Sequence, residues 1–226
     1  MSKHGEPLCL SVLLSNPLTL FSTKDTHKFA YACKGTSVVL YRHEGLRHAQ
    51  YFCYSKWTGG LYSTSTIAGS RPGALLACAW AALMSIGESG YRERVQAILN
   101  ASRAVAEGIS EIPGIRLLGK QAPTMIVCFD STDMDIYRVD SKMTKKGWVL
   151  NSLQGPPCLH LCVTLNFIPR VNKFIDDLRD SVDEVRKEGP GAKQIGSAAI
   201  YGMAGSFPAG PVNEMLRIFT DQTLTP

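Results

Sequence analysis

The C-terminal half of the chain alternates between short apolar runs and amphipathic segments. The runs IRLLG and TMIVCFDS predict two strands, and WVLNSLQGPPCLHLCVTL predicts two more around a Gly-Pro-Pro turn. A helix is predicted over residues 135–147, ending at Gly147. Apolar residues at helical spacing predict another helix over 170–187, and a last helix is predicted over 211–219. The β-β-α-β-β-α order predicts a small α+β domain over residues 111–226.

The N-terminal half has longer polar stretches between its apolar runs. Residues 36–41 (TSVVLY) predict a strand, and residues 50–54 a second short one. The Gly/Ser/Thr-rich stretch 57–73 predicts a loop that is long enough to be functional. Residues 74–86, apolar on nearly all sides, predict a buried helix, which Gly87 and Gly90 interrupt before an amphipathic continuation.

Composition and charge restrict the class of protein. The 226 residues are 45% hydrophobic and 19% charged, as is typical of a globular domain. The net charge of +5 is spread without a Lys/Arg run, so we expect no nucleic-acid partner, and an anionic small-molecule ligand fits the charge equally well. The seven cysteines form no CxxC pair, so neither a disulfide framework nor a zinc ribbon is predicted. The apolar run 8–14 is too short to span a bilayer, and we expect no other membrane segment and a soluble chain.

Two segments carry candidate chemistry. His27 and Lys28 stand just before the predicted strand 36–41, and Lys34 follows closely. A lysine that loses its proton through burial or neighbouring positive charge can add to a carbonyl group. The stretch AGSRPG then places Ser70 and backbone N–H groups at a helix start, which favours a phosphate. Each signal alone is weak, because surface lysines are common and most Gly/Ser-rich loops are only connections. His160 is more typical of a core histidine than of a ligand.

Together these motifs resemble a known family. The segments DTHKFAYACKG and YSKWTGGLYSTSTIAGSRPG are similar to the sphingosine-1-phosphate lyases, within the group II pyridoxal-phosphate-dependent decarboxylases. The resemblance continues through WAALMSIGESGY, DIYRVDSKMTKKGWVLNSLQGPP and IYGMA, and covers about residues 25–204. Amino-acid decarboxylases of the same group typically have tryptophan where Phe29 stands.

The resemblance implies a fold class and a domain organisation. The fold class is α/β, the C-terminal part of a fold-type I pyridoxal-phosphate-dependent transferase. Residues 1–24 would be an atypical N-terminal segment, of which residues 1–21 resemble nothing in the family. Residues 25–110 would be a remnant of the cofactor-binding large domain, and residues 111–226 the small C-terminal domain.

The resemblance also implies roles for individual residues. Lys28 would bind pyridoxal 5'-phosphate covalently, and His27 would contact the cofactor phosphate. Lys34 would help to bind the substrate phosphate. Tyr62 would stand at the active-site entrance near a dimer interface. The loop that reaches the cofactor phosphate across this interface would include Gly69 and Ser70.

The chain departs from the family pattern in two respects. Ala30 and Cys33 replace a glycine and a proline, so we expect a looser loop between the two lysines. The resemblance begins just before Lys28, so we expect the chain to lack the membrane anchor of the family, the group stacked on the cofactor ring and the carboxylate that pairs with its nitrogen.

The activity implied is cleavage of a phosphorylated sphingoid base to a fatty aldehyde and phosphoethanolamine, by a homodimer with its active site at the interface. The family implies the endoplasmic reticulum, whereas a chain without an anchor is also compatible with the cytosol. Two alternatives remain open. The chain could be a catalytically incompetent dimerisation or interaction module, or a pyridoxal-phosphate-dependent amino-acid decarboxylase.

Overall fold

The computed structural model describes residues 21–119, 124–189 and 208–224. The chain divides into two compact units, residues 1–91 and 92–226, each of which is described here by itself. The division falls inside a long helix, whereas the sequence suggested a boundary at its end. The division into 1–24, 25–110 and 111–226 stays a prediction.

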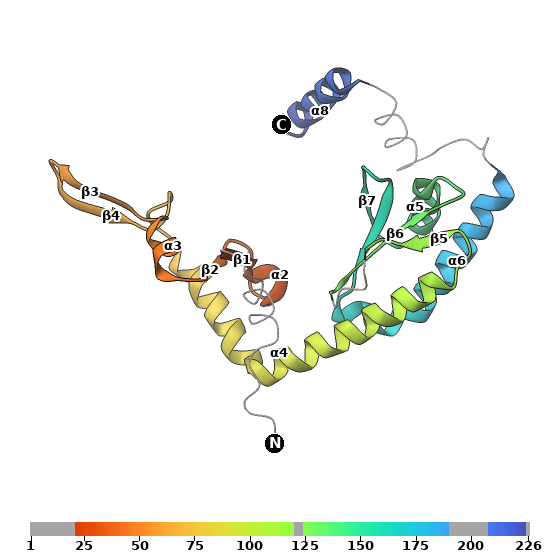
Figure 1. Ribbon diagram of the computed structural model, residues 1–226, viewed down its shortest axis with the longest axis horizontal. Helices are drawn as coiled ribbons and strands as arrows, with labels where there is room; N and C mark the ends of the chain where they lie inside the picture. Colours follow the sequence, from red (N-terminus) through yellow and green to blue (C-terminus); the bar gives the residue numbers. More distant parts are fainter. Residues whose placement is uncertain (1–20, 120–123, 190–207, 225–226) are drawn as a thin grey trace. The chain divides into compact units, whose positions relative to one another are not determined.

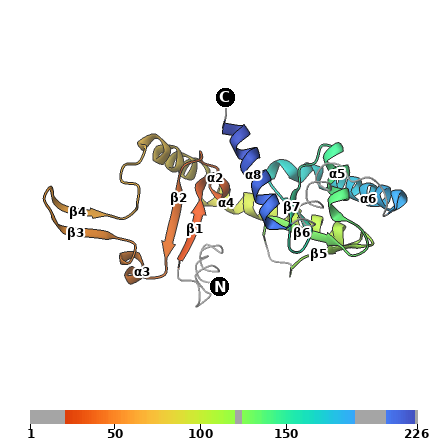
Figure 2. The same ribbon diagram turned by 90° about the horizontal axis from the view of Figure 1, so that it is seen from above.

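The first unit contains two antiparallel strand pairs and the start of the long helix (Figures 1 and 2). Strand β1 (Phe21–Asp25) pairs with β2 (Ser37–Tyr41). The sequence predicted strand β2. Between them lies the helical turn α2 (Thr26–Phe29), and α3 (Glu44–His48) follows. The pairing of β1 was not predicted, because its FSTKD sequence has no clear apolar alternation.

Strands β3 (Phe52–Trp57) and β4 (Gly60–Thr64) form a hairpin. The expectation of a continuous loop over 57–73 is therefore wrong for residues 60–64, which form β4. The turn has Gly60 at φ 115°, a backbone conformation that glycine adopts readily. The Tyr62 ring lies 6.2 Å from that of Phe52 and 5.9 Å from that of Trp57. All three side chains are exposed, so the hairpin carries an open aromatic face.

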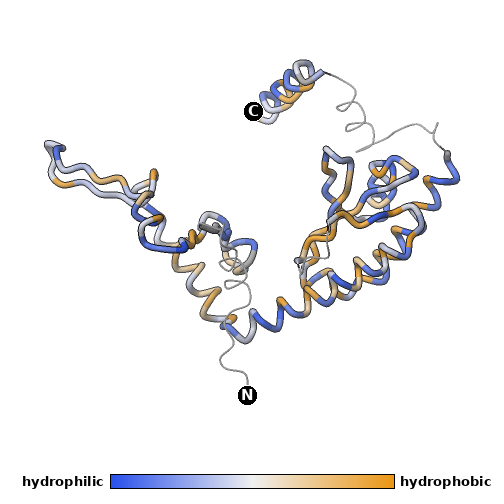
Figure 3. Tube along the Cα trace, in the orientation of Figure 1, coloured by the Kyte–Doolittle hydropathy of each residue, from blue (hydrophilic) through white to orange (hydrophobic). Residues whose placement is uncertain are grey.

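Helix α4 (Gly73–Ser110) contains a break at Gly87, where φ is 67° and ψ is 172°. The predicted interruption at Gly87 is thus confirmed. The predicted burial of residues 74–86 is wrong for the described structure. Figure 3 shows that much of this half of α4 is apolar. Its exposed apolar side chains include Leu76, Trp80, Leu83 and Met84.

The apolar composition of α4 also corrects the expectation that no segment after residue 14 is a membrane candidate. By length and composition alone the helix could cross a membrane, and only 6% of its most apolar window is buried. Core helices of soluble proteins pass the same test, so the helix carries no assignment by itself.

The second unit is built on a four-stranded antiparallel sheet with the order β5-β6-β8-β7. Its strands are β5 (Ile115–Leu117), β6 (Ile126–Ser131), β7 (Asn151–Leu153) and β8 (Cys158–Cys162). The helices are α5 (Ile136–Lys145), the 3-10 helix η1 (Leu165–Arg170), α6 (Val171–Glu188) and α8 (Ala209–Leu224). The predicted β-β-α-β-β-α order and the predicted last helix are confirmed.

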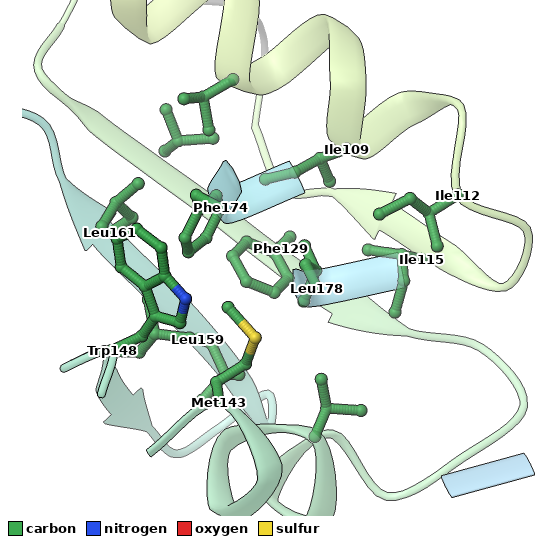
Figure 4. Close-up of a cluster of buried hydrophobic side chains, with 14 of the residues drawn as sticks. Ile109, Ile112, Ile115, Phe129, Met143, Trp148, Leu159, Leu161, Phe174 and Leu178 are labelled. Carbon is green, nitrogen blue, oxygen red and sulfur yellow. The ribbon is translucent and has the colours of Figure 1, made fainter. Parts of the chain in front are cut away.

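One face of this sheet forms the core together with α4, α5 and α6 (Figure 4). Phe129 and Leu159, which are opposite each other on β6 and β8, are fully buried there. The aromatic rings of Trp148 and Phe174 meet edge to face at 5.2 Å. Helix α6 approaches α4 so closely that a Cβ atom at Gly108 would collide with the side chain of Ile175. The apolar residues that repeat at helical spacing along α6, such as Phe174 and Leu178, lie in this core, as the sequence predicted.

The other face of the sheet is polar and rich in sulfur. Arg116 on β5 reaches Asp130 on β6 with Nε 3.0 Å from Oδ1, so its guanidinium covers a buried carboxylate. Cys128 lies opposite His160, which is half-buried on this face rather than part of the core cluster. Among the described residues, no group of three or more His, Cys, Asp or Glu side chains could hold a metal ion.

Candidate functional site

The helical turn that carries His27 and Lys28 is fixed at its first residue. Thr26 is 5% exposed, and its hydroxyl donates to the carbonyl oxygen of Thr36 at 2.9 Å. The carbonyl of Thr26 accepts from the backbone N–H groups of Ala30 and Ala32 at 2.9 and 3.2 Å. Because Thr36 immediately precedes β2, these bonds tie the turn to the strand pair. The position of Lys28 is thus set by the local fold and not by its own side chain.

A second anchor holds the end of the same turn. Tyr91, from α4, donates its hydroxyl to the carbonyl oxygen of Ala30 at 2.8 Å. Its ring lies 6.3 Å from that of Tyr31, which has a left-handed φ of 55°. This conformation is uncommon for a residue with a side chain, and such strained residues cluster at active sites and ligand-binding segments. The sequence contained no signal for this contact, because Tyr91 is 61 residues away from Ala30.

The two lysines of the segment lie in open surroundings. Lys28 is 60% exposed, and its Nζ lies 2.7 Å from Oδ2 of Asp25. The hydrogen bond from this ammonium lowers the pKa of Asp25 below its ordinary value of 3.8. The expectation of a desolvated lysine beside positive charge is therefore wrong for the described structure, since Lys28 is in contact with water and a carboxylate. Lys34 is also exposed.

His27 supplies a free polar atom beside Lys28. Its Nδ1 is buried and has no hydrogen-bond partner among the described residues. A buried ring nitrogen without a partner is costly, so it is suited to an external acceptor or donor. The adjacent amine of Lys28 can add to an aldehyde once it is deprotonated. An aldehyde that carries a phosphate would use both groups, and the residues present fit pyridoxal phosphate in this respect.

The remaining predicted site residues lie on other elements of the first unit. Tyr62 is on β4, and its side chain belongs to the aromatic face of the hairpin. Gly69 and Ser70 are exposed in the segment before α4, which begins at Gly73 directly after Pro72. Arg71 organises this segment by donating to Oγ1 of Thr66 at 2.6 Å. The contact that the structure shows for the Lys28 side chain is with Asp25, so the convergence of Lys28, Tyr62, Gly69 and Ser70 on one site stays a prediction.

The residue directly after Lys34 is closely packed against α4. Gly35 has a φ of 115°, and a Cβ atom there would lie 2.7 Å from Cδ1 of Leu75 in the first turn of α4. Glycine therefore allows Leu75 to approach the backbone directly after Lys34. With Tyr91 bonded to Ala30, α4 contacts both ends of the segment that carries the two lysines, and the looser loop expected from Ala30 and Cys33 stays a prediction.

Comparison with known proteins gives consistent results. No family model matches the chain. Sphingosine-1-phosphate lyase of Arabidopsis thaliana is 48% identical over 198 residues, which cover 87% of this chain and 36% of the lyase. The rice enzyme of the same name is 47% identical over 220 residues, 97% of this chain and 40% of the relative. The chain thus spans less than half the length of these relatives.

The rice alignment also corrects an expectation about the N-terminal segment. Because it covers 97% of the chain, it includes the greater part of residues 1–21. The expectation that this segment resembles nothing in the family is therefore wrong. Its structure lies outside the described residues.

Solved structures give the same fold. Sphingosine-1-phosphate lyase of Burkholderia pseudomallei matches with a TM-score of 0.70 and 38% identity, over 76% of this chain and 39% of the other. Glutamate decarboxylase of Lactobacillus brevis matches with a TM-score of 0.61 at 20% identity, over 80% of this chain and 45% of the other, which shows a shared fold alone. The chain is therefore a homologue of part of the sphingosine-1-phosphate lyases, and its fold is that of the corresponding C-terminal part of a fold-type I pyridoxal-phosphate-dependent enzyme.

Proposed function

We propose that this chain is part of a pyridoxal-phosphate-dependent carbon–carbon lyase that cleaves phosphorylated sphingoid bases to a fatty aldehyde and phosphoethanolamine. The observation that carries the proposal is the 47–48% identity to two sphingosine-1-phosphate lyases over 87–97% of the chain. The anchored turn with Lys28 and the unpartnered Nδ1 of His27 support it. Cleavage and substrate class are properties of a whole enzyme, of which this chain represents a part.

In this proposal each residue has a separate task. Bound pyridoxal phosphate supplies an electron sink for charge that develops on the substrate carbon. Lys28 holds the cofactor through its side-chain nitrogen, and His27 donates a hydrogen bond to the cofactor phosphate. Asp25 orients the Lys28 side chain through the ion pair of 2.7 Å until the cofactor arrives. Lys34 pairs with the substrate phosphate as a point charge.

Three further parts of the proposal rest mainly on the resemblance. Tyr62 lines the entrance, and the loop with Gly69 and Ser70 reaches the cofactor phosphate of a second subunit. The open aromatic face of the β3–β4 hairpin supports a homodimer, because exposed aromatic clusters are typical of interfaces. We place the whole enzyme at the endoplasmic reticulum, as the family resemblance implies.

The first experiment tests covalent capture of the cofactor. The purified chain is mixed with pyridoxal phosphate, reduced with borohydride and digested, and the labelled peptide is identified by mass spectrometry. We expect the label on Lys28 and its loss in Lys28→Ala. Lys56→Ala, which changes an exposed lysine of the hairpin, is the matched control and should keep the label. A label spread evenly over exposed lysines would contradict the assignment.

A second candidate function is a catalytically incompetent dimerisation or interaction module. The specific observation in its favour is that Lys28 is 60% exposed in a chain that spans 36–40% of its relatives. For the 226-residue chain by itself we expect little release of fatty aldehyde from a phosphorylated sphingoid base. Turnover comparable to that of a full-length lyase would show that this chain is catalytically sufficient. The amino-acid decarboxylase alternative is less well supported, because the structural match to one has only 20% identity.

A further inference from the structure

Two cysteines meet on the polar face of the four-stranded sheet. The Sγ atoms of Cys128 on β6 and Cys158 on β8 lie 3.7 Å apart. Both are free thiols. Cys128 is directly opposite His160, so Cys158 and Cys162 are its two diagonal neighbours on β8. The side chain of Cys128 is directed toward Cys158.

The two thiols differ in access to solvent. Cys158 is 4% exposed, whereas Cys128 is half-buried and can be reached by a small reagent. Neither belongs to the hydrophobic core cluster of the described residues, so the contact is not simply part of core packing. In a disulfide the sulfur atoms are ~2.05 Å apart, so the pair must close by a further ~1.7 Å. In a regular sheet diagonal neighbours are about 7–8 Å apart, so closure needs rotation of both side chains together with a small movement of the backbone.

We propose that Cys128 and Cys158 form a reversible thiol–disulfide site that is oxidised by a low-molecular-weight disulfide such as glutathione disulfide. The sulfur of Cys128, as thiolate, attacks one sulfur of the reagent, which forms a mixed disulfide and releases one small thiol. The sulfur of Cys158 then attacks Cys128 and releases the second small thiol. The protein loses two protons and two electrons, and the reagent gains them as two molecules of the small thiol.

The bond would connect the two central strands of the sheet. Its partners are 30 residues apart, and the chain between them contains α5 and β7. Cross-linking removes open conformations from the unfolded state, so the oxidised chain should unfold at a higher denaturant concentration. The site is independent of Lys28, because it lies wholly within the second unit.

The electrostatic surroundings of Cys128 predict how its rate of oxidation depends on pH. Burial, and then the hydrogen bond to Cys158, raise the pKa of the Cys128 thiol to about 11. Asp130 on the same strand acts in the same direction, while Arg116 on β5 pairs with that carboxylate and His160 lies opposite. Because only the thiolate reacts, the rate of oxidation should rise about tenfold per pH unit between roughly pH 7 and 10.

The test uses the full 226-residue chain incubated with glutathione disulfide. Remaining thiols are alkylated, the chain is digested without reduction, and cross-linked peptides are identified by mass spectrometry. We expect one dominant link, Cys128 to Cys158, that a dithiol reductant removes. Cys162→Ser, on the same strand, is the matched control and should leave the link intact. Cys158→Ser should stop at a mixed disulfide on Cys128.

Three results would overturn the proposal. The first is a dominant link from Cys128 to Cys162, the second is a set of links among exposed cysteines, and the third is recovery of Cys128 as free thiol or mixed disulfide in the unchanged chain. All three are read in the unsubstituted protein, so they do not depend on whether a variant folds. Failure of cofactor capture at Lys28 would leave the result unaffected.

Discussion

The hydroxyl of Tyr91 donates a hydrogen bond of 2.8 Å to the carbonyl oxygen of Ala30, across 61 residues of sequence. This bond ends the turn that carries Lys28, in front of a residue with left-handed backbone geometry. Helix α4 is thereby part of the candidate site, although it contributes no group that we expect to touch the cofactor. Tyr91 is a positioning residue in this arrangement.

Replacement Tyr91→Phe keeps the ring contact with Tyr31 and removes the hydrogen bond. We expect the free energy of unfolding of the first unit to fall by about 0.5–1.5 kcal/mol. We also expect slower capture of pyridoxal phosphate by Lys28 because the turn is less constrained. Borohydride trapping over time measures the rate, and denaturation measures stability. Tyr54→Phe, on the exposed hairpin, is the control. Equal capture rates in the unchanged chain, Tyr91→Phe and Tyr54→Phe would show that Tyr91 has no positioning role.

Replacement Asp25→Asn tests the ion pair with Lys28. Loss of the carboxylate removes the acceptor that holds the Lys28 ammonium at 2.7 Å, so the Lys28 side chain is free to turn toward an aldehyde. We expect capture of pyridoxal phosphate to become faster by up to about fivefold, a modest effect because the pair is exposed. Glu44→Gln, which removes a carboxylate paired with His48, should not change the rate. A slower rate in Asp25→Asn would indicate that the carboxylate assists the addition.

Lys34→Ala tests the proposed contact with substrate phosphate. In a full-length homologous lyase that carries the equivalent change, binding of a phosphorylated base should weaken while capture of pyridoxal phosphate remains. A charge-assisted hydrogen bond of this type contributes about 1.5–3 kcal/mol. Binding is compared for phosphorylated and unphosphorylated bases. An equal loss for both would exclude Lys34 as the phosphate contact.

Phe174→Ala tests the core of the second unit. The side chain is fully buried and meets the rings of Trp148 and Phe167, so its removal leaves a cavity that rigid neighbours cannot fill. We expect the free energy of unfolding to fall by about 3–5 kcal/mol. Phe219→Ala on α8, where the side chain is 64% exposed, should change it by less than about 0.5 kcal/mol. Urea denaturation measures both, and similar losses would contradict the assigned core.

Acid should weaken the second unit through Asp177. The hydrogen bond from Lys173, and then that from the indole N–H of Trp148, lower the pKa of Asp177 below its ordinary value of 3.8. Since the folded-state pKa lies below the unfolded-state value, this contribution is complete above about pH 4 to 5 and is lost as the pH falls through the folded-state pKa. Asp177→Asn should reduce stability near pH 7 and make it less dependent on pH below 4. If stability depends on pH below 4 to the same extent in Asp177→Asn and in the unchanged chain, Asp177 is not the source of this acid dependence.

The sequence predicted the second unit better than the first for a physical reason. Apolar residues such as Phe174 and Leu178 repeat at helical spacing, so the helix and its buried face followed from one pattern. In the first unit, the hairpin at Gly60 was missed because its polar, glycine-rich sequence resembles a loop. The exposure of α4 was missed because an apolar helix predicts burial without indicating what covers it.

The candidate site was predictable only in part. The adjacency of His27 and Lys28 is a property of the sequence itself, and the resemblance to lyases follows from it. The ion pair of Lys28 with Asp25 was not expected, although the two are only three residues apart and therefore adjacent on one helical turn. The contact with Tyr91 depends on tertiary structure, which no local pattern encodes.

The close approach of α6 to α4 at Gly108 has a consequence for how the sequence can diverge. The position opposite Ile175 has no room for even a methyl group, so the volumes at 108 and 175 are limited jointly. A lineage that acquires alanine at position 108 would need a smaller residue at 175, such as valine, to restore the distance between the helices. We expect alanine at position 108 to occur among homologues together with a residue smaller than isoleucine at position 175.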